Sequence, residues 1–143
     1  MPGRLQRLMR GPLVALLPAT CELWLDGGHN PAAGEALAAS VDRADPRPLH
    51  LVVGMLSTKD LSGFLRPLST LARSLHTVPV PDESASRDPI EAAAQAMRLG
   101  IPATPASDLT RALRAIAQIE TGPARVLVCG SLYLAGHVLR ENG

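Results

Sequence analysis

The stretch Leu23-Trp24-Leu25-Asp26-Gly27-Gly28-His29-Asn30-Pro31 decides the fold of this 143-residue chain. Its apolar run predicts a buried strand that ends at an acidic residue, and the two glycines predict a tight turn. Asn30 can accept the first free N–H groups of a helix, and Pro31 suits the first helical position. Such a strand–turn–helix unit is typical of an open α/β sheet, in which ligands bind beyond the carboxyl ends of the strands. The alternative is a plain connecting turn with His29 as an exposed residue.

The rest of the chain alternates strand and helix patterns with short connections. Apolar runs predict strands at 13–17, 21–26, 49–54, 75–80, 101–106 and 125–129. Helical spacing and caps predict helices after Pro31, from Leu61 with a break at Pro67, from Pro89 to Gly100, after Asp108 and from Leu132 to Arg140. The helix from Pro89 is expected to bury Ile90, Ala93, Ala94 and Met97, and 81–87 is expected to form a mobile polar loop. This alternation predicts a Rossmann-like α/β fold, with a mostly parallel sheet of about six strands and helices on both faces.

Length and composition limit the domain count and the partners. The length suits one domain over 1–143, with 1–10 as a linker-like tail or an edge strand with Gly3 as a hinge. The net charge is +1 and the arginines are scattered, so no basic stripe is present to bind nucleic acid. Trp24, Phe64 and Tyr133 are the only aromatic residues, too few for a base-stacking surface. We therefore expect a small ligand.

Cysteine usage and hydropathy point to the cytoplasm. Cys21 and Cys129 lie in apolar runs without the close Cys/His spacing of a zinc site, so we expect reduced core thiols and no metal site. An alternative is a secretion signal, since three arginines precede the apolar run at 13–17 and Ala19-Thr20-Cys21 resembles a cleavage site. That run is short and bounded by prolines, which favours a cytoplasmic protein. No stretch approaches the ~20 apolar residues of a membrane span.

Polar residues follow three of the expected strands, at 26–30, at 54–60 and at Gly130-Ser131. The carboxyl ends of parallel strands share one edge of a sheet, so an acid for ribose hydroxyls, the Lys59 cation and the Ser131 hydroxyl are expected there together. Each has a simpler alternative: Lys59 as a solvated charge paired with Asp60, and Ser131 as a helix cap. His50, His76 and His137 are interpreted as structural or surface residues.

Two catalytic motifs are approached but not completed. The segment 54–60 lacks the second glycine and the Mg²⁺-binding hydroxyl of a Walker A loop, because Asp60 follows Lys59. Cys129-Gly130-Ser131-Leu132-Tyr133 lacks the flanking glycines of a nucleophile elbow. A hydrolase is therefore not favoured.

Four motifs together resemble the C-terminal domain of folylpolyglutamate synthase, which is often bifunctional with dihydrofolate synthase, in the Mur ligase superfamily. They are, in order, Pro2-Gly3-Arg4-Leu5-Gln6, Leu25-Asp26-Gly27-Gly28-His29-Asn30-Pro31, Gly54 through Lys59-Asp60, and Gly130-Ser131-Leu132-Tyr133-Leu134-Ala135-Gly136. The resemblance covers essentially the whole chain, and the order and spacing of the motifs make it specific. It implies a mixed sheet with one antiparallel strand.

The resemblance also implies a reaction and a nucleotide site. ATP with Mg²⁺ would activate a folate or dihydropteroate carboxylate as an acyl phosphate, and the amine of L-glutamate would form the amide. Arg4 would reach the nucleotide from the interdomain linker, and Asp26 would hold the ribose. His29 and Asn30 would line the nucleotide and amino-acid side.

The glutamate side is implied in the same way. Lys59 and Ser131 would receive the incoming glutamate, with Tyr133 beside them, and Lys59 and His29 are the catalytic candidates. A cation near an acyl phosphate lowers the free-energy cost of developing negative charge.

The chain also departs from the family pattern. It carries no P-loop, no Mg²⁺ carboxylates and no folate pocket, and Met1 stands where the family usually has tryptophan. We therefore expect a fragment that lacks its N-terminal ATPase partner domain and is inactive as a ligase by itself. The alternatives are a free-standing small-ligand-binding module and a structural partner subunit without catalysis.

Overall fold

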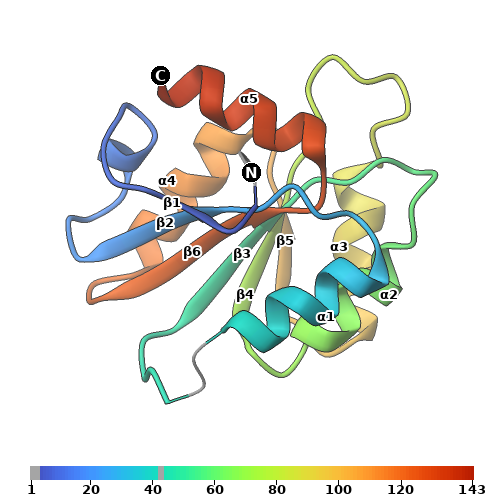
Figure 1. The fold of residues 1–143 in the computed structure, drawn as a ribbon, viewed down its shortest axis with the longest axis horizontal. Helices are drawn as coiled ribbons and strands as arrows, with labels where there is room; N and C mark the ends of the chain where they lie inside the picture. The colour runs from blue at the N-terminus through green and yellow to red at the C-terminus, as the bar shows by residue number, and fades with distance from the viewer. Residues whose placement is uncertain (1–3, 42–43) are drawn as a thin grey trace.

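The computed structural model describes residues 4–41 and 44–143, and its strands form one six-stranded sheet in the order β1-β2-β6-β3-β4-β5 (Figure 1). The strands are β1 (Gln6–Leu8), β2 (Cys21–Leu25), β3 (Leu49–Val53), β4 (Ala72–Thr77), β5 (Ala103–Pro105) and β6 (Ala124–Cys129). The β1–β2 pair is antiparallel, and the pairs β2–β6, β6–β3, β3–β4 and β4–β5 are parallel. The predicted mixed sheet of about six strands is confirmed.

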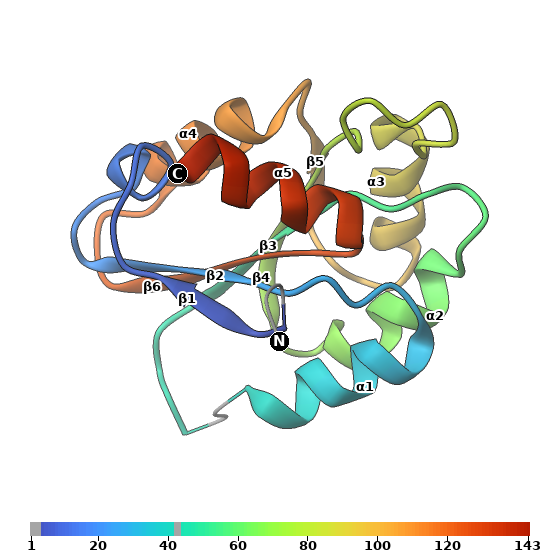
Figure 2. The same cartoon turned by 45° about the horizontal axis from the view of Figure 1, so that its top comes forward.

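Helices cover both faces of the sheet. They are α1 (Pro31–Ser40), α2 (Leu61–Leu65), α3 (Pro89–Arg98), α4 (Leu109–Ile119) and α5 (Leu132–Asn142), with two 3₁₀ turns, η1 (Val14–Leu16) and η2 (Arg66–Leu68). Figure 2 shows α1 and α2 on one side of the sheet and α4 and α5 on the other. The apolar side chains of α1, α2 and α3 pack in one buried cluster and those of α4 and α5 in the other. The predicted α/β class with helices on both faces is confirmed.

The chain leaves neighbouring strands toward opposite faces. From β2 it enters α1 on one face, whereas from β6, which pairs directly with β2, it enters α5 on the other face (Figure 2). This arrangement is a topological switch point, where the connections on neighbouring strands open a crevice at the carboxyl end of the sheet. The motif after β2 lies at that point.

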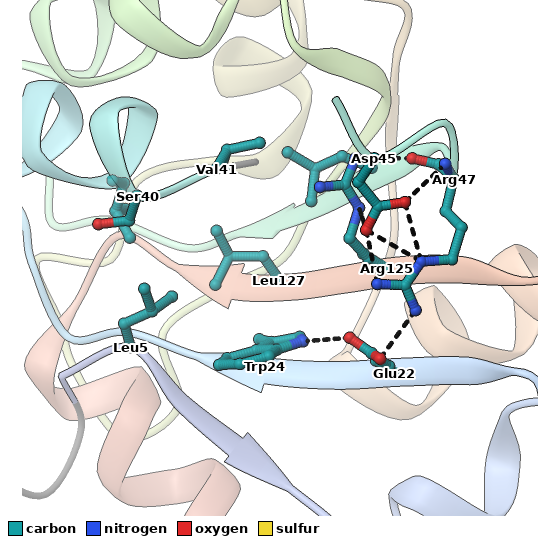
Figure 3. Close-up of a pocket in the computed structure, with 11 residues that line it drawn as sticks. Leu5, Glu22, Trp24, Ser40, Val41, Asp45, Arg47, Arg125 and Leu127 are labelled. Carbon is teal, nitrogen blue, oxygen red and sulfur yellow. Dashed lines mark hydrogen bonds and ion pairs between the residues drawn. The ribbon is translucent and has the colours of Figure 1, made fainter. Parts of the chain in front are cut away.

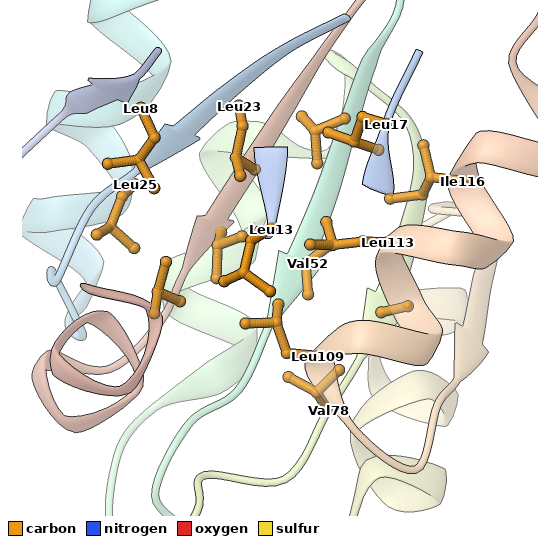
Figure 4. Close-up of a cluster of buried hydrophobic side chains, with 14 of the residues drawn as sticks. Leu8, Leu13, Leu17, Leu23, Leu25, Val52, Val78, Leu109, Leu113 and Ile116 are labelled. Carbon is orange, nitrogen blue, oxygen red and sulfur yellow. The ribbon is translucent and has the colours of Figure 1, made fainter. Parts of the chain in front are cut away.

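The strand predicted at 13–17 is wrong. The segment forms the turn η1, in which Leu16 N–H donates to the carbonyl of Leu13 at 3.1 Å. The edge of β2 is already taken by β1, so a strand at 13–17 has no open partner there. Leu13 and Leu17 are nevertheless buried, in the apolar cluster beneath α4 (Figure 4). The apolar run was a signal of burial and not of strand geometry.

The buried face predicted for α3 is also partly wrong. Ile90 and Met97 are 70% and 61% exposed, whereas Ala92, Ala93 and Ala96 are buried. Alanine allows the helix to lie close against the sheet. The larger side chains then point away from it.

Other predictions concern boundaries and core residues. The strand expected at 75–80 begins earlier, as β4, and the helix from Leu61 gives way to η2 at the predicted Pro67 break. β3 is a central strand, and all five of its residues are buried. Cys21 and Cys129 are free and buried, as predicted, and burial raises the pKa of both thiols. The hinge proposed at Gly3 lies outside the described residues.

Candidate functional site

The three polar motifs do meet at one edge of the sheet. The Asp26 N–H donates to the carbonyl of Val128 at 3.0 Å, and the Gly54 N–H donates to the carbonyl of Cys129 at 3.2 Å. Gly130 has φ +106°, and a Cβ there would lie 2.7 Å from the Gly54 carbonyl oxygen. Only glycine combines that backbone angle with so close an approach. The ends of β2, β6 and β3 are therefore locked side by side.

Asp26 is largely buried at the end of β2, with 6% exposure. Its Oδ1 accepts the Leu5 N–H and its Oδ2 accepts the Gly28 N–H, each at 2.8 Å. A Cβ at Gly28 would lie 2.8 Å from Oδ2, so the glycine makes room for the carboxylate. Asp26 thus fixes both its own turn and the segment that enters β1.

A cavity of about 570 Å³ opens beside this turn. The candidates Arg4, Asp26, His29 and Asn30 all line it, together with apolar residues of α1 and Leu132. Asn30 caps α1 by accepting the Ala33 N–H at 2.8 Å, as predicted. The Nδ1 atom of His29 is buried and has no hydrogen-bond partner among the described residues. It is an unsatisfied polar atom at the cavity.

The other three candidates do not line that cavity. Lys59 is exposed in the loop after β3. Ser131 is 3% exposed and caps α5, where its Oγ accepts the N–H groups of Tyr133 at 3.1 Å and Leu134 at 3.3 Å. Tyr133 is 56% exposed on the first turn of α5. The simpler interpretation of Ser131 as a helix cap is observed.

Arg87 contacts the loop that carries the candidate Lys59, and it was not singled out from the sequence. Its Nη2 donates to the backbone carbonyls of Lys59 at 2.6 Å and Ser57 at 3.3 Å. The sequence gives no local signal for this contact, because Arg87 lies 28 residues from Lys59 in a loop without periodicity. The loop 81–87, predicted to be mobile, is tied by these bonds to the loop that carries Lys59.

A second, smaller cavity of about 270 Å³ lies toward the other end of the strands, beside Trp24 and Leu127 (Figure 3). An ion network closes one end of it: Arg47 donates to Glu22 at 2.8 Å and to Asp45 at 2.6 Å. Hydrogen bonds from Arg47 lower the pKa of the carboxyls of Glu22 and Asp45. Since these charges neutralise one another, we interpret the network as a structural link between β2 and the loop that precedes β3.

The two strand-end motifs after β2 and β3 are held at a fixed separation by the contact between α1 and α2. Gly34 in α1 faces the backbone of Phe64 in α2, and a Cβ at Gly34 would contact the Phe64 carbonyl oxygen and lie 3.0 Å from its carbonyl carbon. A Cβ at Gly63 would lie 2.8 Å from the Pro31 ring. Glycine therefore lets the two helices touch through their backbones.

Two further findings concern ions and membranes. Within 4–41 and 44–143, no group of three or more His, Cys, Asp or Glu residues is arranged to hold a metal ion. The helices of that same part of the chain are all too short or too polar to cross a membrane.

Fold and site together define a Rossmann-like α/β domain that presents polar side chains at the carboxyl ends of its strands, at a topological switch point. The sequence profile of the family described as "Mur ligase, glutamate ligase domain" matches residues 9–132. The chain therefore belongs to this family, and the resemblance inferred from the four motifs is confirmed.

Several known proteins resemble the chain over nearly its whole length. It is 26% identical to the folylpolyglutamate synthase of Lacticaseibacillus casei over 137 residues, which are 96% of this chain and 28% of that protein. It is 30% identical to a probable bifunctional folylpolyglutamate synthase/dihydropteroate synthase of Halobacterium salinarum, over 92% of this chain and 15% of that protein.

Solved structures agree with the sequence relatives. The Mycobacterium tuberculosis folylpolyglutamate synthase complexed with ADP and AMPPCP matches with 26% identity and a TM-score of 0.80, over 100% of this chain and 32% of that chain. A bifunctional folylpolyglutamate synthase/dihydrofolate synthase from Yersinia pestis, with Mn, AMPPNP and L-glutamate bound, matches with 28% identity and a TM-score of 0.76, over 98% and 31%. The chain thus spans about a third or less of each of these relatives.

Proposed function

We propose that this chain is the C-terminal domain of an ATP-dependent amide ligase that adds L-glutamate to a folate. The observation that carries the proposal is the strand-end cavity, where Arg4, Asp26, His29 and Asn30 gather in a domain of the glutamate ligase family. Relatives with this domain are folylpolyglutamate synthases. The domain would act with an N-terminal ATPase domain, which supplies most of the nucleotide site.

The cavity suits the edge of a nucleotide. Asp26 uses one lone pair of each oxygen on a backbone N–H, and an ionised carboxylate has further lone pairs for ribose hydroxyls. Arg4 adds a positive charge on the same wall, and the unsatisfied Nδ1 of His29 can bond a polar ligand atom. Bound ATP would supply the phosphoryl group that activates the folate carboxylate. Mg²⁺ would be bound with the ATP, mainly by the ATPase domain.

The glutamate would meet the loop after β3 and the start of α5. Lys59 would pair with a carboxylate of the amino acid, and Ser131 and Tyr133 would contact it from α5. A positive charge near the reacting carboxyl stabilises the negative charge that develops there, and closure of two domains brings amine and acyl group together without water.

A chimera tests the proposal. The C-terminal domain of the Lacticaseibacillus casei synthase is replaced by this chain, and ATP-dependent transfer of radiolabelled glutamate to a folate is measured. We expect transfer by the chimera, none by the chain alone and strongly reduced but measurable transfer by a chimera with Lys59→Ala. Transfer by the chain alone contradicts its inactivity as a fragment, and a folded, ATP-binding chimera without transfer contradicts the proposed function.

Calorimetry separates the alternative functions. A ligase domain should show tight nucleotide or glutamate binding only when the ATPase domain is present. A free-standing ligand-binding module would bind ATP or glutamate by itself. A structural subunit would bind the ATPase domain but leave turnover unchanged.

A further inference from the structure

The loop that carries Lys59 is paired with the loop 81–87. The Ser57 N–H donates to the carbonyl of Ala85 at 2.8 Å, and the Arg87 N–H donates to the carbonyl of Met55 at 3.0 Å. Between these bonds, Leu56 and Ser86 form an antiparallel bridge. The loop after β3 is therefore supported along one side by a segment that comes some thirty residues later.

The Arg87 side chain adds further hydrogen bonds to the same loop. Its side chain is only 10% exposed, and its Nη2 donates to the carbonyls of Lys59 and Ser57, at 2.6 and 3.3 Å. The Lys59 N–H is bonded in turn to the carbonyl of Leu56 at 3.1 Å. Both sides of the Lys59 peptide unit are thus held. Hydrogen bonds from a charged donor are stronger than neutral ones.

The segment after Lys59 is also anchored. Asp60 caps α2 by accepting the Gly63 N–H at 2.9 Å. Lys59 itself has an exposed, flexible side chain, so the direction of its ammonium group depends on where its backbone is fixed. Arg87 holds the Lys59 carbonyl, and the Asp60 cap anchors the residue that follows.

We propose that Arg87 is the positioning residue for Lys59 in the binding of the amino-acid substrate, an inference that rests on the proposed function. Arg87 does not contact the substrate. It fixes the Lys59 peptide unit, so that the ammonium group is held where an α-amino dicarboxylate presents a carboxylate. One guanidinium nitrogen, Nη2, donates to both carbonyls, so a single side chain ties the Ser57 and Lys59 peptide units together.

Steady-state kinetics of the chimera test the proposal. Arg87→Gln should raise the KM for glutamate by about ten- to a hundredfold, the range expected when a substrate-positioning group is displaced by about 1 Å. The KM for ATP should stay unchanged, because the nucleotide cavity does not include this loop. Arg87→Lys should recover part of the loss, since one ammonium can still reach one carbonyl. Arg111→Gln, on the exposed side of α4, is the matched control and should keep both KM values.

A double-mutant cycle separates positioning from general structural support. If Arg87 acts through Lys59, Arg87→Gln should add no further loss in a Lys59→Ala background. Additive losses, or a KM for ATP that rises equally, overturn the proposal. Amide hydrogen exchange of the 143-residue chain adds a readout independent of turnover: the N–H groups of Ser57 and Lys59 should exchange faster in Arg87→Gln at an unchanged melting temperature.

The outcomes separate a failure of the proposed function from a failure of the role of Arg87. If the wild-type chimera transfers no glutamate, the proposed function fails and this inference falls with it. If the wild type is active and Arg87→Gln keeps the wild-type KM for glutamate, only the role of Arg87 is refuted.

Discussion

Replacing Gly34 by alanine should destabilise the protein, although alanine is the better helix former. In an exposed helix interior the exchange stabilises by about 1 kcal/mol. Here the new Cβ would contact the carbonyl oxygen of Phe64 and lie 3.0 Å from its carbonyl carbon and 3.2 Å from its Cα. These are backbone atoms of α2, which cannot turn aside as a side chain can.

The size of the effect follows from these two opposing contributions. Forcing an extra methyl group into a well-packed contact costs about 1–3 kcal/mol, and the rigid backbone of α2 favours the upper part of that range. After subtraction of the gain of about 1 kcal/mol in helix propensity, a net loss of about 1–2 kcal/mol remains. With a urea m-value of roughly 2 kcal/mol/M, the unfolding midpoint should fall by about 0.5–1 M at unchanged m.

A second glycine provides the control. Gly136 lies inside α5, and a Cβ there would approach only the flexible Arg140 side chain, at 3.3 Å. Gly136→Ala should therefore raise the free energy of unfolding by up to about 1 kcal/mol, and the urea midpoint should rise with it. If Gly34→Ala is as stable as the wild type or more stable, the close contact between α1 and α2 does not constrain the fold, and the reasoning is refuted.

Three further substitutions test the charged and buried groups. Because Arg47 lowers the pKa of Glu22 in the folded state, stability should be lost as the pH falls below the ordinary value of 4.5, and Arg47→Gln should flatten that loss in urea titrations at successive pH values. Burial lowers the pKa of His76 below 6.5, so the folded state favours the neutral imidazole and loses stability as the pH falls below 6.5. His76→Leu should show a smaller loss of melting temperature over that range, and an unchanged slope contradicts this. Asp26→Ala leaves two backbone N–H groups without their acceptor and should cost about 2–3 kcal/mol in urea unfolding, whereas a loss below 0.5 or so would mean that water replaces the carboxylate.

Features encoded by neighbouring residues could be predicted from the sequence. The helix caps at Asn30, Asp88 and Asp108 each accept an N–H two or three residues further on, as the structure shows. The central position of β3 followed from its continuous apolar run. In each case the physical cause lies within a few residues, so a single sequence contains it.

Features that depend on distant partners could not be predicted. Which face of α3 is buried depends on how closely the helix approaches the sheet, so the side chains of Ile90 and Met97 gave no reliable signal. Whether an apolar run becomes a strand depends on which segments pair with the sheet, and β1 rather than 13–17 pairs with the edge of β2. Hydropathy indicates that a segment tends to be buried. Its conformation and its buried face depend on the segments that pack against it.

The candidate site shows the same division. The turn after β2 and the side chains around it were predicted and do line one cavity. The burial of Asp26 and its bond to the Leu5 N–H were not, because that contact joins segments 21 residues apart. Arg87 and the Arg47 network were missed for the same reason, since charged residues in irregular loops carry no periodic pattern.

The position of β6 has a consequence for the synthesis of the protein. β6 is the last strand along the chain but pairs with both β2 and β3. While a ribosome is still producing residues 124–129, the facing edges of β2 and β3 have no partner, and the nascent polypeptide can form only two separate pieces of sheet. Unpaired edges of this kind invite aggregation, and pairing between strands so far apart in sequence is slow. The nascent chain should therefore depend on chaperones until β6 inserts, and a deletion of β6 should yield an aggregating polypeptide instead of a smaller domain.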